Sequence, residues 1–343
     1  MIASHVLTLT PDYVSTWSLW EAVRELLQNA IDQRTLNKSR IIFEYEDEKL
    51  TIGSTNAYLS PKTLLLGMTD KRNDATIGQF GEGYKLAMLV LTRMSYDVKL
   101  RNGSELWVPA FEYNEEYESH VLVINRYEAE DCGGVFFDIT NVSEDGFGDI
   151  AEKYLPDVPL DVILDEDHLR KKVFLGGLFV CEIDDLEYGY NFAPRRLVLD
   201  RDRGMASSFD VSCATSAIWS RVDDDKRLYA NLSAGGLDTS FVNVSRVSTN
   251  RYVVEQYLKE TPNAIPVSSD DEAKRLIAAG NTVRRVPTAL CNLLRRMHKF
   301  VFNRSGTPCE RLERFQQQFG RFMNDEAKTE WKSIMEASKE WNG

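Results

Sequence analysis

The chain has 343 residues, 43% of them hydrophobic, so it is long enough to build two sizeable cores and exceeds the usual length of one domain. Its formal net charge of −12 argues against non-specific binding to a nucleic-acid backbone, which needs a basic surface, and we expect no nucleic-acid partner. The five cysteines are widely spaced and odd in number and the four histidines are scattered, which argues against a disulfide framework and a zinc site.

The alternation and periodicity of apolar residues predict an N-terminal layer of helices on a sheet. The expected elements, in chain order, are a strand over residues 2–9, a long helix over about 15–37, strands over 41–45 and 50–52, a short helix over 60–66, a helix over 84–94, and strands over 96–101, 105–111, 120–126 and 135–141. Residues 67–76 are polar and aperiodic, as expected for a loop that closes over a ligand. Helices on one face of a mixed, mostly antiparallel sheet make an α/β sandwich of the α+β class.

A domain boundary is predicted over residues 155–164, where Pro156 and Pro159 interrupt an acidic stretch. We therefore expect a first domain over 1–155, a second α/β domain over 160–300 and C-terminal helices over 301–343. The second domain should hold strands over 172–179 and 197–199, a helix over 209–222 and a strand-helix-strand-helix unit over 264–300. Aromatic stripes on the last helices, over 310–323 and 326–341, are more typical of core, although a terminal aromatic helix is a fair candidate for a dimer contact.

Charge and hydropathy bear on partners and location. A late basic cluster comprises Arg284, Arg285, Arg295, Arg296, Lys299 and Arg304. Such a cluster is more often a solvated face or an intramolecular partner for acidic residues than a binding site. No apolar run approaches the roughly twenty residues that span a bilayer, and the first residues lack a basic-then-apolar signal, so we expect a cytoplasmic protein without a membrane partner.

The most informative segment is residues 24–32, which read R-E-L-L-Q-N-A-I-D. On a helix, Glu25, Asn29 and Asp32 stand at i, i+4 and i+7 and share one face. Asn29 can offer an oxygen to Mg²⁺ bound to a phosphate chain, and Glu25 can act as a base towards water. Taken alone, such a face is usually just solvated.

Residues 77–85 read I-G-Q-F-G-E-G-Y-K and stand before an apolar helix. Backbone amides of Gly78, Gly81 and Gly83 at a helix N-terminus can hold phosphate, although a glycine cluster is more often only a turn. The order of the two segments, and the apolar strand between them, make the combination more specific. Together they predict a nucleotide pocket, to which Gln79, Phe80, Glu82 and Tyr84 of the second segment also contribute.

These two segments resemble the GHKL, or Bergerat-fold, ATPases. The similarity is greatest to the N-terminal and middle domains of the ninety-kilodalton heat-shock chaperone, whose motifs read R-E-L-x-x-N-A-x-D and I-G-Q-F-G-x-G, and to compact, stand-alone members found in bacteria and phages. The resemblance implies ATP and Mg²⁺ as cofactors, with Glu25 as general base and Asn29 as the metal ligand. It also makes Gly78, Gly81 and Gly83 the glycines of the lid and triphosphate cradle, followed by Lys85 as a phosphate contact.

The resemblance extends to the second domain. Residues 172–184 read K-V-F-L-G-G-L-F-V-C-E-I-D, a strand-turn-strand pattern, and residues 197–205 read L-V-L-D-R-D-R-G-M. In relatives, a transducer domain carries a similar strand and a loop whose basic residue reaches the γ-phosphate. Arg201 aligns best with that residue and Arg203 is the reserve candidate; a guanidinium suits the phosphate oxygens. The alternative is that the alternating acidic and basic residues 200–203 only form a charged surface at the end of a strand.

Two departures from the family concern recognition of the base. Where relatives have D-x-G-x-G, this chain has Ser54 in place of the aspartate that reads the adenine amino group, and Asn56 and Tyr58 in place of the glycines. Ser54 could accept one hydrogen bond, or the Asn56 carboxamide could replace the carboxylate. At residues 132–140, Gly134 stands where relatives have a threonine that helps to hold adenine.

The sequence therefore predicts an ATP-binding conformational switch with slow, Mg²⁺-dependent hydrolysis, in which the triphosphate drives lid closure. An unidentified, chaperone-like protein client is expected as a partner. A homodimer through residues 1–17 or the C-terminal helices is a further candidate. The alternative function is a non-catalytic module that holds or sequesters a nucleotide or a nucleotide-like ligand.

Overall fold

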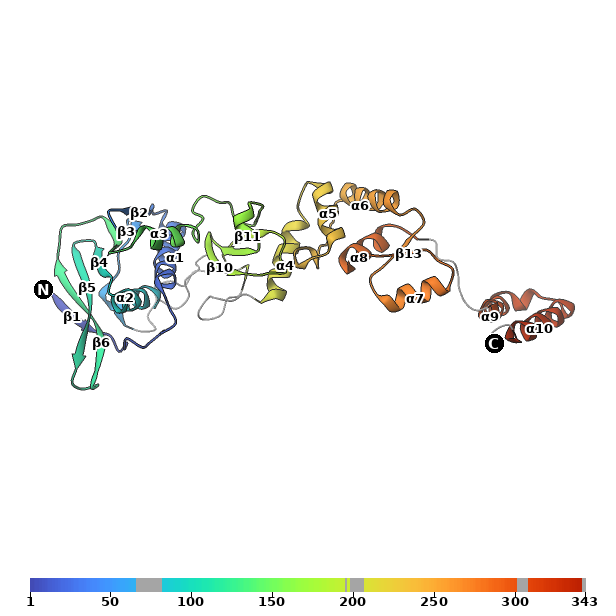
Figure 1. Cartoon of the computed structure of the whole chain (residues 1–343), viewed down its shortest axis with the longest axis horizontal. Coiled ribbons are helices and arrows are strands. Elements are labelled where there is room, and N and C mark those ends of the chain that lie inside the picture. Colours follow the sequence, from blue (N-terminus) through green and yellow to red (C-terminus); the bar gives the residue numbers. More distant parts are fainter. Residues whose placement is uncertain (66–81, 195, 198–206, 301–307, 341–343) are drawn as a thin grey trace. The chain divides into compact units, whose positions relative to one another are not determined.

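The computed structural model describes residues 1–65, 82–194, 196–197, 207–300 and 308–340 (Figure 1). These residues form a protein of the α+β class, as the sequence predicts. Contacts divide the chain into two compact units, one of Met1–Asp184 and Tyr188–Asp210 and the other of Asp185–Glu187 and Val211–Gly343. No helix among the described residues is long and apolar enough to cross a membrane.

The first unit contains a seven-stranded sheet with the strand order β1-β6-β5-β4-β7-β3-β2. Its strands are β1 (Ala3–Val6), β2 (Ile41–Glu46), β3 (Lys49–Thr55), β4 (Asp97–Asn102), β5 (Glu105–Asn114), β6 (Ser119–Glu128) and β7 (Gly134–Thr140). All neighbouring pairs in this sheet are antiparallel, whereas a mixed, mostly antiparallel sheet was predicted. Strand β1 is shorter than predicted, although the Leu7 N–H still donates to the Leu122 carbonyl of β6.

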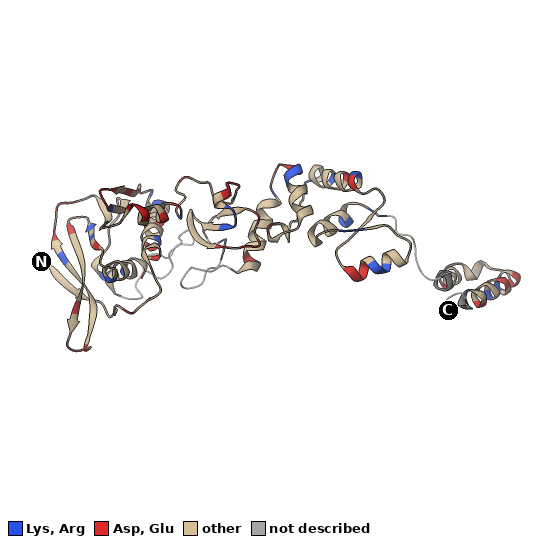
Figure 2. Cartoon of the chain, in the orientation of Figure 1, with Lys and Arg blue, Asp and Glu red and all other residues tan. Residues whose placement is uncertain are grey.

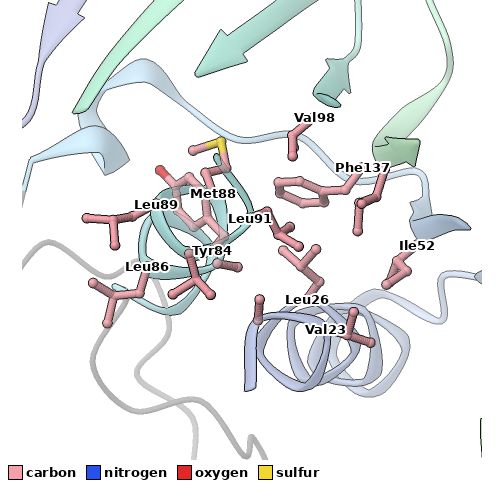
Figure 3. Packing of buried hydrophobic residues seen from close by; sticks show 14 of the residues in the cluster. Val23, Leu26, Ile52, Tyr84, Leu86, Met88, Leu89, Leu91, Val98 and Phe137 are labelled. Carbon is pink, nitrogen blue, oxygen red and sulfur yellow. The ribbon is translucent and has the colours of Figure 1, made fainter. Parts of the chain in front are cut away.

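Helices α1 (Leu19–Asn37) and α2 (Gly83–Arg93) pack against this sheet. Because side chains alternate along a strand, Ile52 of β3 and Phe137 of β7, which are direct partners across the ladder, point to the same face. Figure 3 shows both side chains together with Leu26 of α1 and Leu91 of α2. These residues belong to one buried hydrophobic cluster that joins the two helices to the sheet.

The bounds of α1 follow from local chemistry. The helix begins later than predicted because Ser18 is its N-cap, and the Glu21 carboxylate accepts a hydrogen bond of 2.7 Å from the Ser18 N–H. It ends at Asn37, as predicted, where Lys38 adopts a left-handed φ of 55°. The predicted short helix over 60–66 is a 3-10 helix, η1 (Pro61–Leu64). A further helix, α3 (Glu144–Ala151), follows β7 and was not predicted.

A second sheet in the first unit has the strand order β10-β9-β11-β8. Its strands are β8 (Val162–Leu164), β9 (Lys172–Leu175), β10 (Leu178–Glu182) and β11 (Gly189–Phe192), and a 3-10 helix, η2 (Asp167–Leu169), precedes β9. The predicted strand-turn-strand pattern is the hairpin of β9 and β10. Strand β11 pairs parallel with β9 and antiparallel with β8, and neither β8 nor β11 was predicted. The predicted strand over 197–199 lies largely outside the described residues.

The second unit is mainly helical. It contains most of α4 (Ser208–Trp219), then α5 (Asp225–Ala234), η3 (Leu237–Thr239), α6 (Val247–Glu260), β12 (Ile265–Val267), α7 (Asp270–Ala278), β13 (Val283–Arg285), α8 (Thr288–Met297), α9 (Pro308–Phe319), η4 (Gly320–Phe322) and α10 (Asp325–Glu340). Strands β12 and β13 pair in parallel, so the predicted strand-helix-strand-helix unit is confirmed. The predicted domain boundaries near 155 and 300 remain predictions.

Four members of the late basic cluster have partners within this unit. Arg284 pairs with Glu260 at 2.9 Å, and Arg295 pairs with Glu272 at 2.8 Å. Arg285 likewise pairs with an acidic residue, Asp270, and Arg296 donates to the Asn243 side chain at 2.7 Å. Helix α7, where two of these acidic partners lie, carries both acidic and basic residues (Figure 2). Three of these arginines therefore serve as intramolecular partners of acidic residues, one of the two alternatives that the sequence leaves open.

Candidate functional site

The three polar residues of the first motif lie on α1, and two of them are buried. Glu25 is 4% exposed and Asp32 is 1% exposed, while Asn29 is partly buried. A solvated helix face would leave such side chains in water. Carboxylates are rarely buried without a structural or chemical purpose. The burial therefore argues against the solvated-face alternative for Glu25 and Asp32.

The glycine that begins α2 touches the carboxylate of α1. A Cβ atom placed on Gly83 would lie 2.3 Å from Oε2 of Glu25, so a larger residue would displace that carboxylate. Oε1 of Glu25 lies 3.6 Å from the Arg24 guanidinium, and both side chains are about 5% exposed. The two sequence motifs thus meet in space, with the acidic group next to the N-terminal, positively polarised end of a helix.

Asn29 is oriented by its own helix. Its Nδ2 donates to the Glu25 carbonyl at 2.9 Å, so Oδ1 is the end of the amide that can serve as a metal ligand. Among the described residues, no group of three or more His, Cys, Asp or Glu side chains could hold a metal ion. This donor set fits Mg²⁺ held by one protein oxygen together with phosphates and water, and it does not fit a cage made by the protein alone.

Asn29 also lines a pocket with about 430 Å³ of empty space, its open mouth included. The lining comes from α1, β3, the loop after β3, α2 and β7: Leu26, Asn29, Ala30, Gln33, Gly53, Ser54, Ala57, Tyr58, Leu59, Tyr84, Val135 and Phe137. Three of these, Leu26, Tyr84 and Phe137, are labelled in Figure 3 and also belong to the buried hydrophobic cluster. A mostly apolar pocket with a few polar groups is the usual form of a small-molecule site.

The residues that differ from the family motif, Ser54, Asn56 and Gly134, do not all line this pocket. Ser54 is buried and lines it, whereas Asn56 is exposed and is not part of the lining. Asn56 adopts a left-handed φ of 54°, and its N–H donates to the Gly133 carbonyl at 2.8 Å. Glycine and asparagine both tolerate this conformation, so Asn56 can adopt the backbone conformation that the glycine of the family motif would adopt at this position. Gly134 lies against β3, because a Cβ atom there would be 2.5 Å from the Ser54 carbonyl oxygen.

Asn102 fixes one wall of the pocket and was not predicted. It is fully buried at the end of β4, its Oδ1 accepts from the Leu59 N–H, and its Nδ2 donates to the Leu59 carbonyl, both at 2.8 Å. Residues 57–59 line the pocket, so this paired hydrogen bond positions the loop that carries them. In the sequence, Asn102-Gly103 is typical of a turn between strands, which concealed the second role of Asn102.

Lys85 is fully buried in the first turn of α2. Its Nζ donates to the carbonyls of Thr63 at 2.8 Å and Leu65 at 2.7 Å. Beside it, the Tyr84 and Thr63 hydroxyls lie 2.9 Å apart. Burial lowers the pKa of Lys85 and raises the pKa of Tyr84 to about 12. The contact of Lys85 with phosphate remains a prediction, since here its ammonium group is held by carbonyl oxygens.

Several predicted site residues lie outside the described residues. They are Gly78, Gln79, Phe80, Gly81, Arg201 and Arg203, together with the predicted lid over 67–76. Of the second motif, the structure describes Glu82 as the N-cap of α2, then Gly83, Tyr84 and Lys85. The described part of the predicted site therefore comprises the lining of the 430 Å³ pocket, Glu25, and the first residues of α2.

No protein-family model matches this chain, and a search of the curated proteins found no match. The family assignment therefore stays a proposal, supported by the motifs and by the geometry around α1.

Proposed function

We propose that this protein is a conformational switch of the GHKL class that binds and slowly hydrolyses ATP with Mg²⁺. The observation that carries the proposal is the position of the buried Glu25 carboxylate. It touches Gly83 at the start of α2 and lies one helical turn from Asn29, which lines the pocket. A buried carboxylate beside a ligand pocket is a good candidate for a general base.

The roles follow from the chemistry of each side chain. The purine base of the nucleotide lies in the pocket between α1, β3 and β7, and the triphosphate extends towards Glu25 and the N-terminus of α2. Oδ1 of Asn29 would hold Mg²⁺, which would neutralise charge on the phosphates. Glu25 accepts a proton from the water that attacks the γ-phosphate, and ADP and inorganic phosphate leave.

The switch part of the proposal rests on the described residues that flank residues 66–81, the segment that contains the predicted lid over 67–76. Residues 66–81 join Leu65 to Glu82, and Lys85 donates to the Leu65 carbonyl. Leu65 and Lys85, which stand on either side of this segment in the chain, are thus bonded to each other. In the proposal, a ligand that breaks or remakes this hydrogen bond acts on α2, and through α2 on the hydrophobic core.

Calorimetric titration and phosphate release test the proposal. We expect ATP with Mg²⁺ to bind the wild type, and Asn29→Ala to lose that binding. Glu25→Gln should bind ATP within about threefold of the wild type and hydrolyse it 10²- to 10⁴-fold more slowly, roughly the contribution of a general base. Glu44→Gln, an exposed glutamate on β2, is the matched control and should leave both properties unchanged.

The possible results separate the hypotheses. Absence of ATP binding by the wild type would refute the proposal. Binding without turnover would favour the non-catalytic module instead. Unchanged turnover in Glu25→Gln would show that Glu25 is not the base.

A further inference from the structure

Within the part of the chain that the structure describes, the lining of the pocket carries no carboxylate. Its polar side chains are Asn29, Gln33 and Ser54, with the hydroxyl groups of Tyr58 and Tyr84, and the remaining members are apolar or glycine. A carboxylate accepts hydrogen bonds and cannot donate them. It therefore favours bases that present amino or ring N–H groups and disfavours a carbonyl at the same place. This source of base selection is missing from the described lining.

The two carboxamides are already oriented by bonds along α1. Oε1 of Gln33 accepts from the Asn37 side chain at 2.7 Å, and Nδ2 of Asn29 donates to the Glu25 carbonyl. Turning over the Asn29 amide would break its bond to the backbone carbonyl, whereas the Gln33 amide can turn over together with the exposed Asn37 amide and keep a bond to it. They lie on the helix side of the pocket, across from the strand that carries Ser54.

The backbone near Ser54 is also largely engaged. Ser54 pairs with Ile41 on one side and with Val135 on the other, and both polar groups of Leu59 are bonded to Asn102. The Ser54 side chain points to the same face as Ile52 and is 3% exposed. Its hydroxyl is therefore the polar group that β3 presents to the pocket.

A hydroxyl both donates and accepts, because its hydrogen rotates to suit the partner. It can accept from the 6-amino group of adenine or donate to the 6-carbonyl of guanine. A pocket that selects by buried, one-way hydrogen bonds rejects the wrong partner by about 10⁴-fold, whereas selection by apolar contact is far weaker.

We infer that this pocket holds purine bases by shape and takes GTP as well as ATP, with Ser54 satisfying either base. This inference rests on the proposed nucleotide function and specifies its substrate class. The carboxylate-free lining, the Gln33 amide that can turn over and the buried hydroxyl all lead to the same result, which is weak discrimination at position 6 of the purine.

Titrations of ATP and GTP, each with Mg²⁺, into the full chain test the inference. We expect the two dissociation constants of the wild type to agree within about tenfold. Ser54→Ala should weaken both by a similar factor of up to about tenfold, because the hydrogen bond to either base is lost, and should leave their ratio unchanged. Ser54→Asp should raise the preference for ATP at least tenfold, because a carboxylate accepts from the amino group and repels the carbonyl of guanine. Thr55→Asp, whose side chain points to the opposite face of β3, is the matched control and should leave the ratio unchanged.

The outcomes are distinguishable from those of the proposed function. If the wild type binds ATP more than 100-fold more tightly than GTP, the inference is wrong and the ATP switch stands. If the wild type binds neither nucleotide, both fail. The ratio of the ATP and GTP dissociation constants of the wild type tests the inference even if Ser54→Asp does not fold.

Discussion

The buried ammonium group of Lys85 is the least expected feature at the scale of single residues. Its position after three glycines led to the prediction of a phosphate contact, but its Nζ donates to the carbonyls of Thr63 and Leu65. A sequence pattern can place a lysine in the first turn of a helix. It cannot show whether the long side chain turns outward to a ligand or inward to the backbone, because that depends on the packing of a distant segment.

This burial predicts a dependence of stability on pH. Because burial lowers the pKa of Lys85, the folded state holds this proton less firmly than the unfolded chain does. Burying the charged ammonium group costs folding free energy, and this cost is fully present at pH values below the pKa of Lys85 in the folded state. The cost falls as pH rises from that pKa towards the pKa of Lys85 in the unfolded chain. We expect the wild type to become more stable relative to Lys85→Met as pH rises from 7 to about 9.5, below the range in which Tyr84 titrates. Urea denaturation at several pH values measures this difference.

Lys99→Met is the matched control for that experiment, because Lys99 is exposed and pairs with Asp97 across a single residue. Its stability difference from the wild type should barely change over the same pH range. A stability difference for Lys85→Met that stays flat or shrinks with rising pH would show that Lys85 is not buried as an ammonium group.

At the scale of elements, long periodic segments were predictable, whereas the short strands β8 and β11 were not. Helix α1 and the strands of the first sheet have patterns that extend over several turns or alternations, so their type and approximate place could be predicted. Strands β8 and β11 have only three and four residues. Strand β11, G-Y-N-F, is buried throughout and therefore shows no alternation. Its role as a central strand comes from pairing with two other strands, which local sequence does not encode.

The hydrogen bonds of Asn102 connect β4 to the loop that lines the pocket, and this connection can be tested. In Asn102→Ala, the N–H and carbonyl of Leu59 both lose their partner, so we expect a loss of about 2 kcal/mol in stability. Because residues 57–59 line the pocket, ATP affinity should also fall, by roughly tenfold for a loss of about 1.4 kcal/mol. Thermal unfolding and calorimetric titration measure the two effects.

Asn114→Ala separates pocket geometry from general stability. The Asn114 side chain accepts from the N–H groups of Glu116 and Tyr117 in the turn between β5 and β6, and Asn114 is not among the residues that line the pocket. This variant should lose stability and keep its affinity for ATP. Equal affinities in the two variants would argue that Asn102 supports the fold but does not shape the pocket.

At the scale of the whole molecule, the compact unit extends beyond the predicted first domain. The sequence suggested an end at residue 155, where prolines interrupt an acidic stretch. In the structure, the Leu155 N–H donates to the Gly177 carbonyl at 2.8 Å and the Phe179 N–H to the Lys153 carbonyl at 3.0 Å. Leu178 joins the same hydrophobic cluster as α1 and α2. Prolines reveal a break in regular structure but give no information on which later strand packs back on the core.

Fragments of the chain decide between these two boundaries. A fragment of residues 1–210 keeps Leu178 and Phe179 against the first core, whereas a fragment of residues 1–155 exposes the surface that they cover, including Tyr154. Burial of a leucine and part of a phenylalanine, with the two hydrogen bonds, amounts to about 4 kcal/mol. We therefore expect the shorter fragment to unfold roughly 10 °C lower in a thermal melt. If both fragments unfold at the same temperature, the boundary lies at residue 155, and the second sheet is an independent domain instead of a part of the unit that carries the pocket.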